Sequence, residues 1–194
     1  MTIVAALFVR QDSIYKTMPG VDAWDAERDA RRWPGGCPVI AHPPCRARGA
    51  FAWRANPRPG ERDLAVWAVA QVRAWGGVLE HPAGSALWPE HGLPEPGAGC
   101  DQFGGWTIGV NQHEFGHRAL KPTRLYIAGC SPRDIPPLPL VLGRPECVIG
   151  DVGRASLGTK RREIPKAERE ATPPEFARWL VDLAGRCRVM ERAA

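Results

Sequence analysis

A cysteine at the end of a predicted strand is the side chain best suited to chemistry in this sequence. Cys45 follows two prolines in the stretch AHPPCRARG, with Pro44 before it and Arg46 after it. Because Pro-Pro ends the strand that His42 closes, we expect the thiol to be exposed at the carboxyl edge of a parallel sheet, where ligands bind. A cysteine thiolate in that place can act as a nucleophile.

Acidic and basic side chains follow in two later stretches. Glu80 lies in VLEHPAGS at the end of another predicted strand, and NQHEFGHRALKPTRLYIAG carries Gln112, Arg118 and Arg124. A carboxyl group beside a nucleophile can act as an acid. Arginines can lower the pKa of a thiol, orient a carboxylate or hold a phosphate. We therefore expect these side chains to meet Cys45 at one site.

The third stretch also contains His-Glu-Phe-Gly-His, in which His113 and His117 have the spacing of a zinc metalloprotease helix. That site needs an α-helix longer than one turn. Glycines precede the motif and Pro122 follows it, so we do not expect a helix there. Leu120 and Thr123 stand where an extended motif would place a glycine and a third histidine. The protease is therefore the third hypothesis, and we predict no metal site.

Three motifs together resemble the cytosine-5 DNA methyltransferase family: Pro43-Pro44-Cys45, Glu80-His81-Pro82 and the segment from Gln112 to Arg124. In that family a Pro-Cys turn supplies the nucleophile, a Glu-Asn-Val at the next strand end supplies an acid, and a Gln-x-Arg-x-Arg segment contacts the catalytic centre. The resemblance covers roughly residues 38–129, with the third motif stretched and the acid's neighbours changed. The chain looks most like small phage-encoded relatives of these enzymes.

The resemblance implies an enzyme that acts at carbon 5 of a pyrimidine, cytosine in DNA above all, and transfers a methyl group. The thiolate of Cys45 would add to carbon 6 of the ring, and Glu80 at ring nitrogen 3 would favour that addition. Arg118 and Arg124 would complete the catalytic set. Substrate contacts are expected from four residues: His42, Pro44, Arg46 and Gln112. A base in duplex DNA would have to flip out, and Trp53 could stack in the gap.

Methyl transfer would use S-adenosylmethionine, which the family binds on a Gly-rich loop after the first strand. An aromatic residue of that loop and an acid at the end of the second strand complete the family's donor site. Phe8, Asp22 and Asp25 correspond to these positions, but LFVRQDSIYKTMPG has no glycine cluster. The expected partner is DNA or a pyrimidine nucleotide, and the alternative function is a non-catalytic or repurposed DNA-binding relative without the donor site.

Hydrophobic periodicity predicts an α/β fold with a mostly parallel sheet and helices on its faces. The resemblance implies that this fold is Rossmann-like, of methyltransferase type, with helices on both faces of the sheet. Strands are expected at 3–9, 38–42, 78–82 and 123–129, and helices at 23–33, 61–75 and after Thr172. The helix at 61–75 would bury a stripe formed by Leu64, Trp67, Ala68, Val72 and Trp75. Thr172 to Glu175 form a capping-box pattern before a face of Phe176, Leu180, Leu183 and Ala184.

Length and composition favour one domain, 1–194, with a Pro- and Arg-rich insertion around 131–166. A formal charge of +5 is compatible with a nucleic-acid or nucleotide partner. The six cysteines form no Cys-x-x-Cys pair, and neither a leader nor a long apolar run is present. We therefore predict no membrane span and a cytoplasmic location, which would be the host cytoplasm for a phage-encoded protein.

Overall fold

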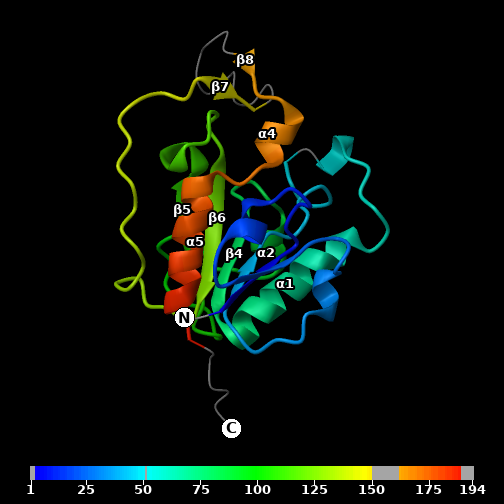
Figure 1. The fold of residues 1–194 in the computed structure, drawn as a ribbon, viewed down its shortest axis with the longest axis vertical. Helices are drawn as coiled ribbons and strands as arrows, with labels where there is room; N and C mark the ends of the chain where they lie inside the picture. The colour runs from blue at the N-terminus through cyan, green and yellow to red at the C-terminus, as the bar shows by residue number, and fades with distance from the viewer. Residues whose placement is uncertain (1–2, 51, 150–161, 189–194) are drawn as a thin grey trace.

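A six-stranded sheet runs through the middle of the molecule (Figure 1). The computed structural model describes residues 3–50, 52–149 and 162–188. The strands are β1 (Val4–Leu7), β2 (Val21–Trp24), β3 (Val39–Ala41), β4 (Gly77–Pro82), β5 (Trp106–Asn111) and β6 (Pro122–Ala128). They lie in the order β2-β1-β3-β4-β6-β5, with β1 to β4 pairing in parallel and β6 antiparallel to both of its neighbours. The predicted α/β class with a mostly parallel sheet is confirmed.

Two long helices and several short ones connect the strands. The α-helices are α1 (Glu61–Trp75), α2 (Leu87–Glu90), α4 (Lys166–Glu170) and α5 (Pro174–Arg186). The 3-10 helices are η1 (Ile14–Thr17), η2 (Ala30–Arg32), η3 (Ala52–Arg54) and η4 (Gln112–Phe115). Within the described ranges, no helix is long and apolar enough to cross a membrane.

A second, two-stranded sheet forms in the predicted Pro- and Arg-rich insertion. It pairs β7 (Cys147–Val148) with β8 (Arg162–Glu163) near α4, at one end of the molecule (Figure 1). Cys147 of β7 packs with Ala119 and Ile164 in a small apolar cluster. Residues 150–161 of the insertion lie outside the described residues.

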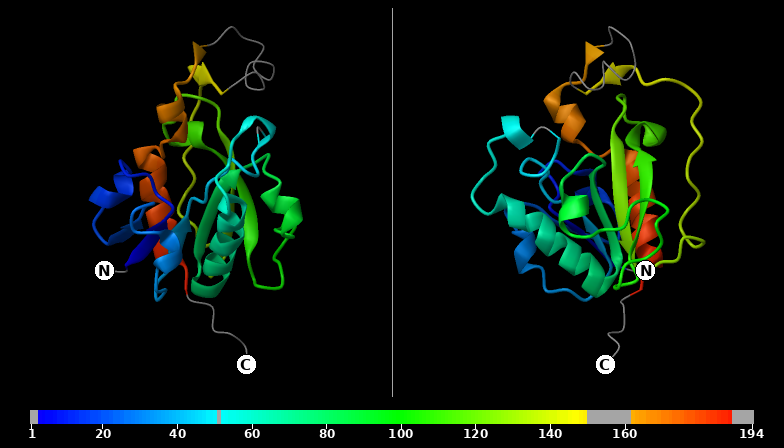
Figure 2. Two further views of the ribbon diagram at one scale, coloured as in Figure 1. Left: turned by 90° about the vertical axis from the view of Figure 1, so that its right-hand side faces the viewer. Right: turned by 180° about the vertical axis from the view of Figure 1, so that it is seen from behind.

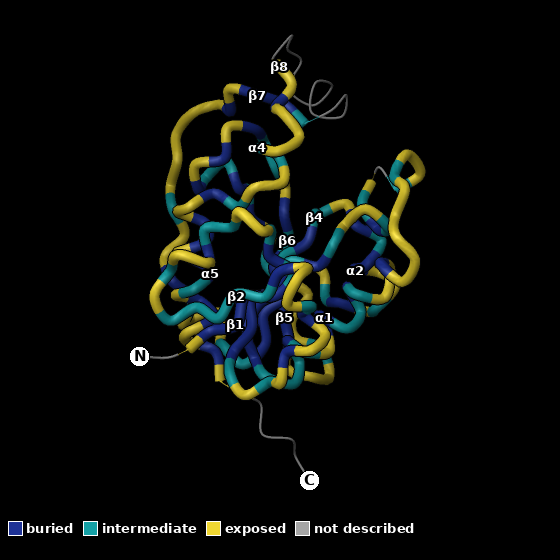
Figure 3. The backbone as a smooth tube through the Cα atoms, turned by 45° about the vertical axis from the view of Figure 1, so that its right-hand side comes forward, coloured by how far each residue is buried: buried dark blue, intermediate teal, exposed yellow. Residues whose placement is uncertain are grey.

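The core has two layers because side chains alternate between the two faces of the sheet. Val78 and Leu125 pack in one apolar cluster with α5, whereas Leu79 and Tyr126 pack in the other with α1. Figure 2 shows α1 and α5 on opposite sides of the sheet, and Figure 3 shows the buried strands between them. Helices therefore cover both faces, as expected.

The predicted helix at 23–33 is wrong. Val21–Trp24 is the edge strand β2, and only Ala30–Arg32 form a short 3-10 turn. Two interactions explain the difference. Trp24 pairs in register with Leu7 of β1, and the Asp25 carboxylate accepts the backbone N–H groups of Glu27 (3.0 Å) and Arg28 (3.1 Å), which ends the strand in a tight turn. The strand β5, which follows Gly104 and Gly105, was also not predicted.

The two long helices match their predicted positions but differ in detail. In α1 the buried residues include Ala65 and Val69, whereas Leu64, Trp67 and Trp75 of the predicted stripe are only half-buried at its sides. The predicted apolar face of α5 is fully buried: Phe176, Leu180, Leu183 and Ala184. Its capping box does not form, because Pro173 is the N-cap and no side chain caps the helix.

Gly77 allows β4 to lie against β3. Its φ is +119°, and an added Cβ would lie 2.0 Å from the carbonyl oxygen of Val39. Gly77→Ala should therefore separate the two central strands and lower the free energy of unfolding by about 3 kcal/mol or more in urea denaturation. The control is Gly36→Ala, where φ is +101° and nothing lies within 4 Å. In Gly36→Ala the free energy of unfolding should fall by only about 1–2 kcal/mol, which is the cost of a left-handed backbone conformation for a residue with a side chain. An equal fall in both variants would contradict the steric argument.

Candidate active site at the carboxyl edge of the sheet

A hydrogen-bonded cluster surrounds Glu80 at the end of β4. Nδ1 of His42 lies 3.1 Å from Oε2 of Glu80, and Nε2 of Gln112 donates to Oε1 at 2.9 Å. On the far side of His42, Nε2 lies 3.0 Å from the hydroxyl oxygen of Tyr15. Gln112 also donates to Oγ1 of Thr123 at 3.1 Å. Two side chains thus hold Glu80 directly, and each of them has a further buried partner.

The sheet topology brings these side chains together. Tyr15 lies in η1 after β1, His42 directly follows β3, and Gln112 directly follows β5. These strands and β4 leave the sheet at the same edge, and β6 enters it there because it runs antiparallel. Glu80 alternates with Leu79, so it shares the α5 face with Val78. The structure therefore joins three predicted site residues, His42, Glu80 and Gln112, at one point.

Glu80 is ionised at neutral pH. Burial raises the pKa of its carboxyl group, but the hydrogen bond from His42 and the positive charges of His42 and Lys121 outweigh burial and hold the pKa at about 2. An ionised carboxylate can only accept hydrogen bonds, so the Nδ1–H of His42 must point at Glu80. The expected proton-donating acid is therefore a carboxylate before any substrate arrives.

Lys121, Tyr15 and Thr123 belong to the site although sequence reasoning did not select them. Lys121 precedes β6, and its backbone oxygen accepts the Thr123 hydroxyl at 3.1 Å. Burial lowers the pKa of the Lys121 ammonium, while the charges of Glu80 and Cys45 raise it. The one sequence signal for Lys121 was its place in the same basic stretch as Arg118. No sequence signal pointed to Tyr15, because it lies in a connection whose position depends on the pairing of β1 with β2.

Cys45 is exposed on the turn after β3, as the Pro-Pro motif predicted. Its carbonyl oxygen accepts the backbone N–H groups of Arg48 (3.1 Å) and Gly49 (2.7 Å), which closes the turn. Desolvation by the surrounding protein, and then the charge of Glu80, raise the pKa of the thiol. The positive charge that opposes this rise is that of Lys121.

Arg46 and Arg118 are held in ion pairs. Arg46 makes two bonds to the buried Glu61 at the start of α1, at 2.9 and 2.5 Å, so it anchors the Cys45 turn. Arg118 pairs with Glu146 at 3.1 Å and with Glu168 at 3.2 Å. The structure therefore places Arg118 in contacts around the second sheet and not in the Glu80 cluster. Pro44 lies within the turn beside Cys45 and is half-buried.

Arg124 lies on the opposite face of the sheet from Glu80. It pairs across the strands with His81, whereas Leu125 pairs with Glu80. Its guanidinium bonds to Glu95 at 2.6 Å, over the Trp88 ring. Arg124 therefore does not join Glu80 in the site, contrary to the prediction. Successive residues of a strand point to opposite faces of the sheet, so the side chain of Arg124 faces away from Glu80.

The residues expected to bind S-adenosylmethionine do not fit that role. Asp22 accepts Nε1–H of Trp24 at 2.7 Å and a guanidinium N–H of Arg28 at 2.6 Å. Asp25 is 3% exposed and accepts Lys16 Nζ at 2.5 Å as well as two backbone N–H groups. Both acids line a polar pocket of about 390 Å³, but internal donors already occupy their oxygens.

Phe8 does not complete a donor site either. It directly follows β1 with a φ of +60°, and the edge of its ring contacts Trp67 of α1, with 5.8 Å between ring centroids. The aromatic ring therefore packs into the α1 layer. The loop after β1 continues to a side-chain pair between Arg10 and Asp12 at 2.8 Å, without the glycines that would bring a backbone close to a nucleotide.

The two histidines of the zinc-like motif do not lie on an α-helix. Gln112–Phe115 form a single 3-10 turn that ends at Gly116, whose φ is +91°. Nδ1 of His113 bonds to the carbonyl oxygen of His117 at 3.0 Å. Over the described residues, no group of three metal-ligating side chains is assembled. The geometry therefore lacks the helical pair of ligands that the protease hypothesis requires.

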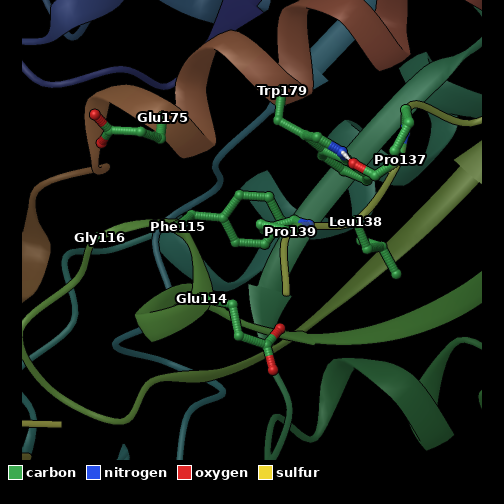
Figure 4. A pocket seen from close by; sticks show the side chains of 8 residues that line it. All are labelled: Glu114, Phe115, Gly116, Pro137, Leu138, Pro139, Glu175 and Trp179. Carbon is green, nitrogen blue, oxygen red and sulfur yellow. Dashed lines mark hydrogen bonds between the residues drawn. The ribbon is translucent and has the colours of Figure 1, made fainter. Parts of the chain in front are cut away.

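A second pocket, of about 370 Å³, lies between η4, α5 and the segment 137–139 (Figure 4). The indole N–H of Trp179 donates to the carbonyl oxygen of Pro137 at 3.0 Å and ties this segment to α5. Phe115 packs beneath, and Glu114 and Glu175 point away from its ring (Figure 4). None of the lining residues belongs to the Glu80 cluster, so we assign no chemistry to this pocket.

Comparison of the sequence with protein-family models and with curated proteins finds no match. The functional conclusion therefore rests on the geometry of the Glu80 cluster and on the motif resemblance.

His81 should make the stability of the fold depend on pH. It is fully buried against Trp88, and burial lowers its pKa from 6.5 to about 4, against the opposing charge of Glu80. Between these two values the unfolded chain binds more protons than the folded protein. The free energy of unfolding should therefore fall as the pH drops from about 7 to about 4.

His81→Phe should flatten this dependence in urea denaturation at several pH values. His91→Gln, at a more exposed site, should keep most of it. A wild-type stability that does not change over this pH range would contradict a neutral, buried His81.

Proposed function

We propose that this protein is an enzyme that modifies carbon 5 of cytosine in DNA through a covalent adduct of Cys45, and that its sheet is Rossmann-like, of the methyltransferase type. The observation that carries the proposal is the ionised carboxylate of Glu80, held by His42 and Gln112 at the sheet edge where the Cys45 turn begins. A buried carboxylate with two fixed donors and a nearby thiol suits a base that presents N–H groups.

In the proposed reaction the sulfur of Cys45 forms a bond to carbon 6 of the base, and the electrons of the 5,6 double bond move toward carbon 5. The thiol loses one proton and ring nitrogen 3 gains one, so the addition is balanced. Glu80 stabilises the product because its carboxylate accepts the new N3–H and an N–H of the 4-amino group. Carbon 5 then takes up a methyl group, whose donor leaves with the electron pair of the broken bond, and carbon 5 loses its own proton. The S–C6 bond breaks, and the sulfur of Cys45 leaves with its electrons and takes back the proton that ring nitrogen 3 releases.

The charge state of Glu80 favours cytosine over uracil. Cytosine presents an amino group beside nitrogen 3, and both can donate to a carboxylate once nitrogen 3 is protonated. Uracil presents a carbonyl oxygen in place of the amino group, and a buried carboxylate would repel it. The hydrogen bond from His42 and the positive charge of Lys121 help to keep Glu80 ionised and therefore contribute to this choice.

The loop between β3 and α1 offers a surface on which a base can stack. Trp53 in η3 is 73% exposed, and the guanidinium of Arg54 lies 4.3 Å from the centroid of its ring. Exposed aromatic rings with neighbouring cations are the platforms on which proteins stack single-stranded or flipped bases. This loop follows the Cys45 turn directly in sequence, which favours a nucleic-acid substrate.

The central experiment measures exchange of the hydrogen on carbon 5 in D2O, because addition of Cys45 makes carbon 5 exchangeable without any group donor. Wild-type protein should introduce deuterium into a cytosine-containing oligonucleotide, detected by mass spectrometry. Cys45→Ser should abolish exchange, and Glu80→Gln should slow it by about 10²-fold or more. Cys100→Ser, which also removes an exposed thiol, is the matched control and should exchange normally. Absence of exchange in the wild type would overturn the proposal.

A second candidate is a DNA-binding relative that has lost the donor site, and the engagement of Asp22 and Asp25 by internal donors favours it. The resemblance to cytosine-5 DNA methyltransferases implies that the transferred group is methyl, with S-adenosylmethionine as its donor. Since the donor residues do not fit S-adenosylmethionine, we expect calorimetry to detect no saturable binding of this compound. Binding of one equivalent of S-adenosylmethionine would instead support Asp22 and Asp25 as residues that bind the methyl donor. Oligonucleotide binding without carbon 5 exchange would favour the second candidate.

A further inference from the structure

Tyr15 is a buried side chain that the proposed reaction does not use directly. It is fully buried in η1, and its hydroxyl oxygen lies 3.0 Å from Nε2 of His42. The two rings lie 5.4 Å apart between centroids, tilted by 38°. Burial, and then the charge of Glu80, raise the pKa of the phenol, so it keeps its proton. Tyr15 thus reaches Glu80 only through the imidazole of His42.

The direction of these hydrogen bonds follows from the charge of Glu80. Because the carboxylate only accepts, His42 donates through Nδ1. When His42 is neutral, its Nε2 then carries a lone pair, and the Tyr15 hydroxyl donates to it. When His42 is protonated, Nε2 carries a hydrogen, and the Tyr15 oxygen accepts it. The hydroxyl therefore satisfies Nε2 in both charge states, and it fixes the ring with Nδ1 toward Glu80.

We propose that Tyr15 is a positioning residue, which holds His42 with its Nδ1–H on Glu80 and so keeps Glu80 an ionised, oriented acceptor for the N–H groups of the base. This inference rests on the proposed function for its chemical meaning. It adds to that function a residue from the loop after β1, which the motif resemblance assigns to donor binding. The hydroxyl strengthens the His42 bond because hydrogen bonds in a chain polarise one another.

Other charged groups act on the same cluster and set the background for any pH measurement. Glu80 feels His81 from β4 and Lys121 from the segment before β6, and its own charge acts on Cys45. Glu170 and Arg169 of α4 act on Lys121. Since none of these groups touches the Tyr15 hydroxyl through a hydrogen bond that is seen in the described residues, removal of the hydroxyl tests its link to His42.

The test follows the titration of the Glu80 carboxyl group by carbon-13 NMR, with the Glu80 signal assigned by its absence in Glu80→Gln. The wild-type carboxyl should titrate at the acid end of the pH range, with a midpoint near 2 that is well below the value of an ordinary glutamate. Tyr15→Phe should move the midpoint upward by about one pH unit, and His42→Ala should move it further. His42→Asn keeps an N–H donor near the position of Nδ1 and should restore most of the wild-type behaviour.

The control is Tyr126→Phe, which removes another buried hydroxyl. It is bonded to Asp101 at 2.7 Å, and its side chain lies on the opposite face of the sheet from Glu80. It should leave the Glu80 titration unchanged. In the carbon 5 exchange assay, Tyr15→Phe should lower the rate at saturating substrate about tenfold and leave KM nearly unchanged. A Glu80 midpoint in Tyr15→Phe equal to that of the control would overturn the inference.

The NMR titration does not depend on turnover, so the two proposals fail separately. If Tyr15→Phe and His42→Ala raise the Glu80 midpoint as expected but the wild type shows no carbon 5 exchange, the proposed function is overturned. The link from Tyr15 to Glu80 then stands. Exchange in the wild type with no shift in Tyr15→Phe would overturn the inference alone.

Discussion

The buried, ionised carboxylate of Glu80 is the interaction on which the site depends. A charge removed from water is tolerated only where hydrogen-bond donors and opposite charges replace the solvent. Here His42 and Gln112 donate to its two oxygens, and Lys121 supplies a positive charge nearby. Each donor needs an orienting partner of its own, which Tyr15 and Thr123 provide. The arrangement of five segments at this edge therefore follows from the requirements of one carboxylate.

The pleat of the sheet decides which residues can join that carboxylate. Glu80 and Leu125 face α5, whereas His81 and Arg124, one position away on the same strands, face α1. A basic stretch that looks uniform in sequence is thus divided between two faces. Lys121 comes near the cluster because it precedes β6, while Arg124 bonds to Glu95 on the far side. The antiparallel entry of β6 is the reason that Thr123, and not a later residue, reaches Gln112.

Several arginines around the Cys45 turn serve the fold before they serve any ligand. Arg46 bonds to Glu61, and the buried Arg48 pairs with Glu90. These pairs connect the turn to the start of α1 and to the end of α2, so the thiol is presented on a rigid segment. They also neutralise much of the local positive charge. Contact with phosphates would therefore depend on less constrained groups, such as Arg54 beside the exposed ring of Trp53.

The α/β class, most of the central strands and the two long helices can be predicted from the sequence, because apolar periodicity directly indicates which face of an element is buried. Cys45, Glu80 and His42 could be selected because each lies at or near the end of a predicted strand, whereas Gln112 was selected through the motif resemblance, since β5 was not predicted. The edge strand at 21–24 could not be predicted in this way, because it forms through non-local pairing with β1. Three further features also depend on contacts that local sequence does not encode. They are the sheet face on which Arg124 lies, the ion pairs of Arg46 and Arg118, and the bonds that Asp22 and Asp25 accept from nearby residues. Tyr15 entered the site for this reason too: its contact with His42 spans 27 positions, and no local pattern encodes a contact at that separation.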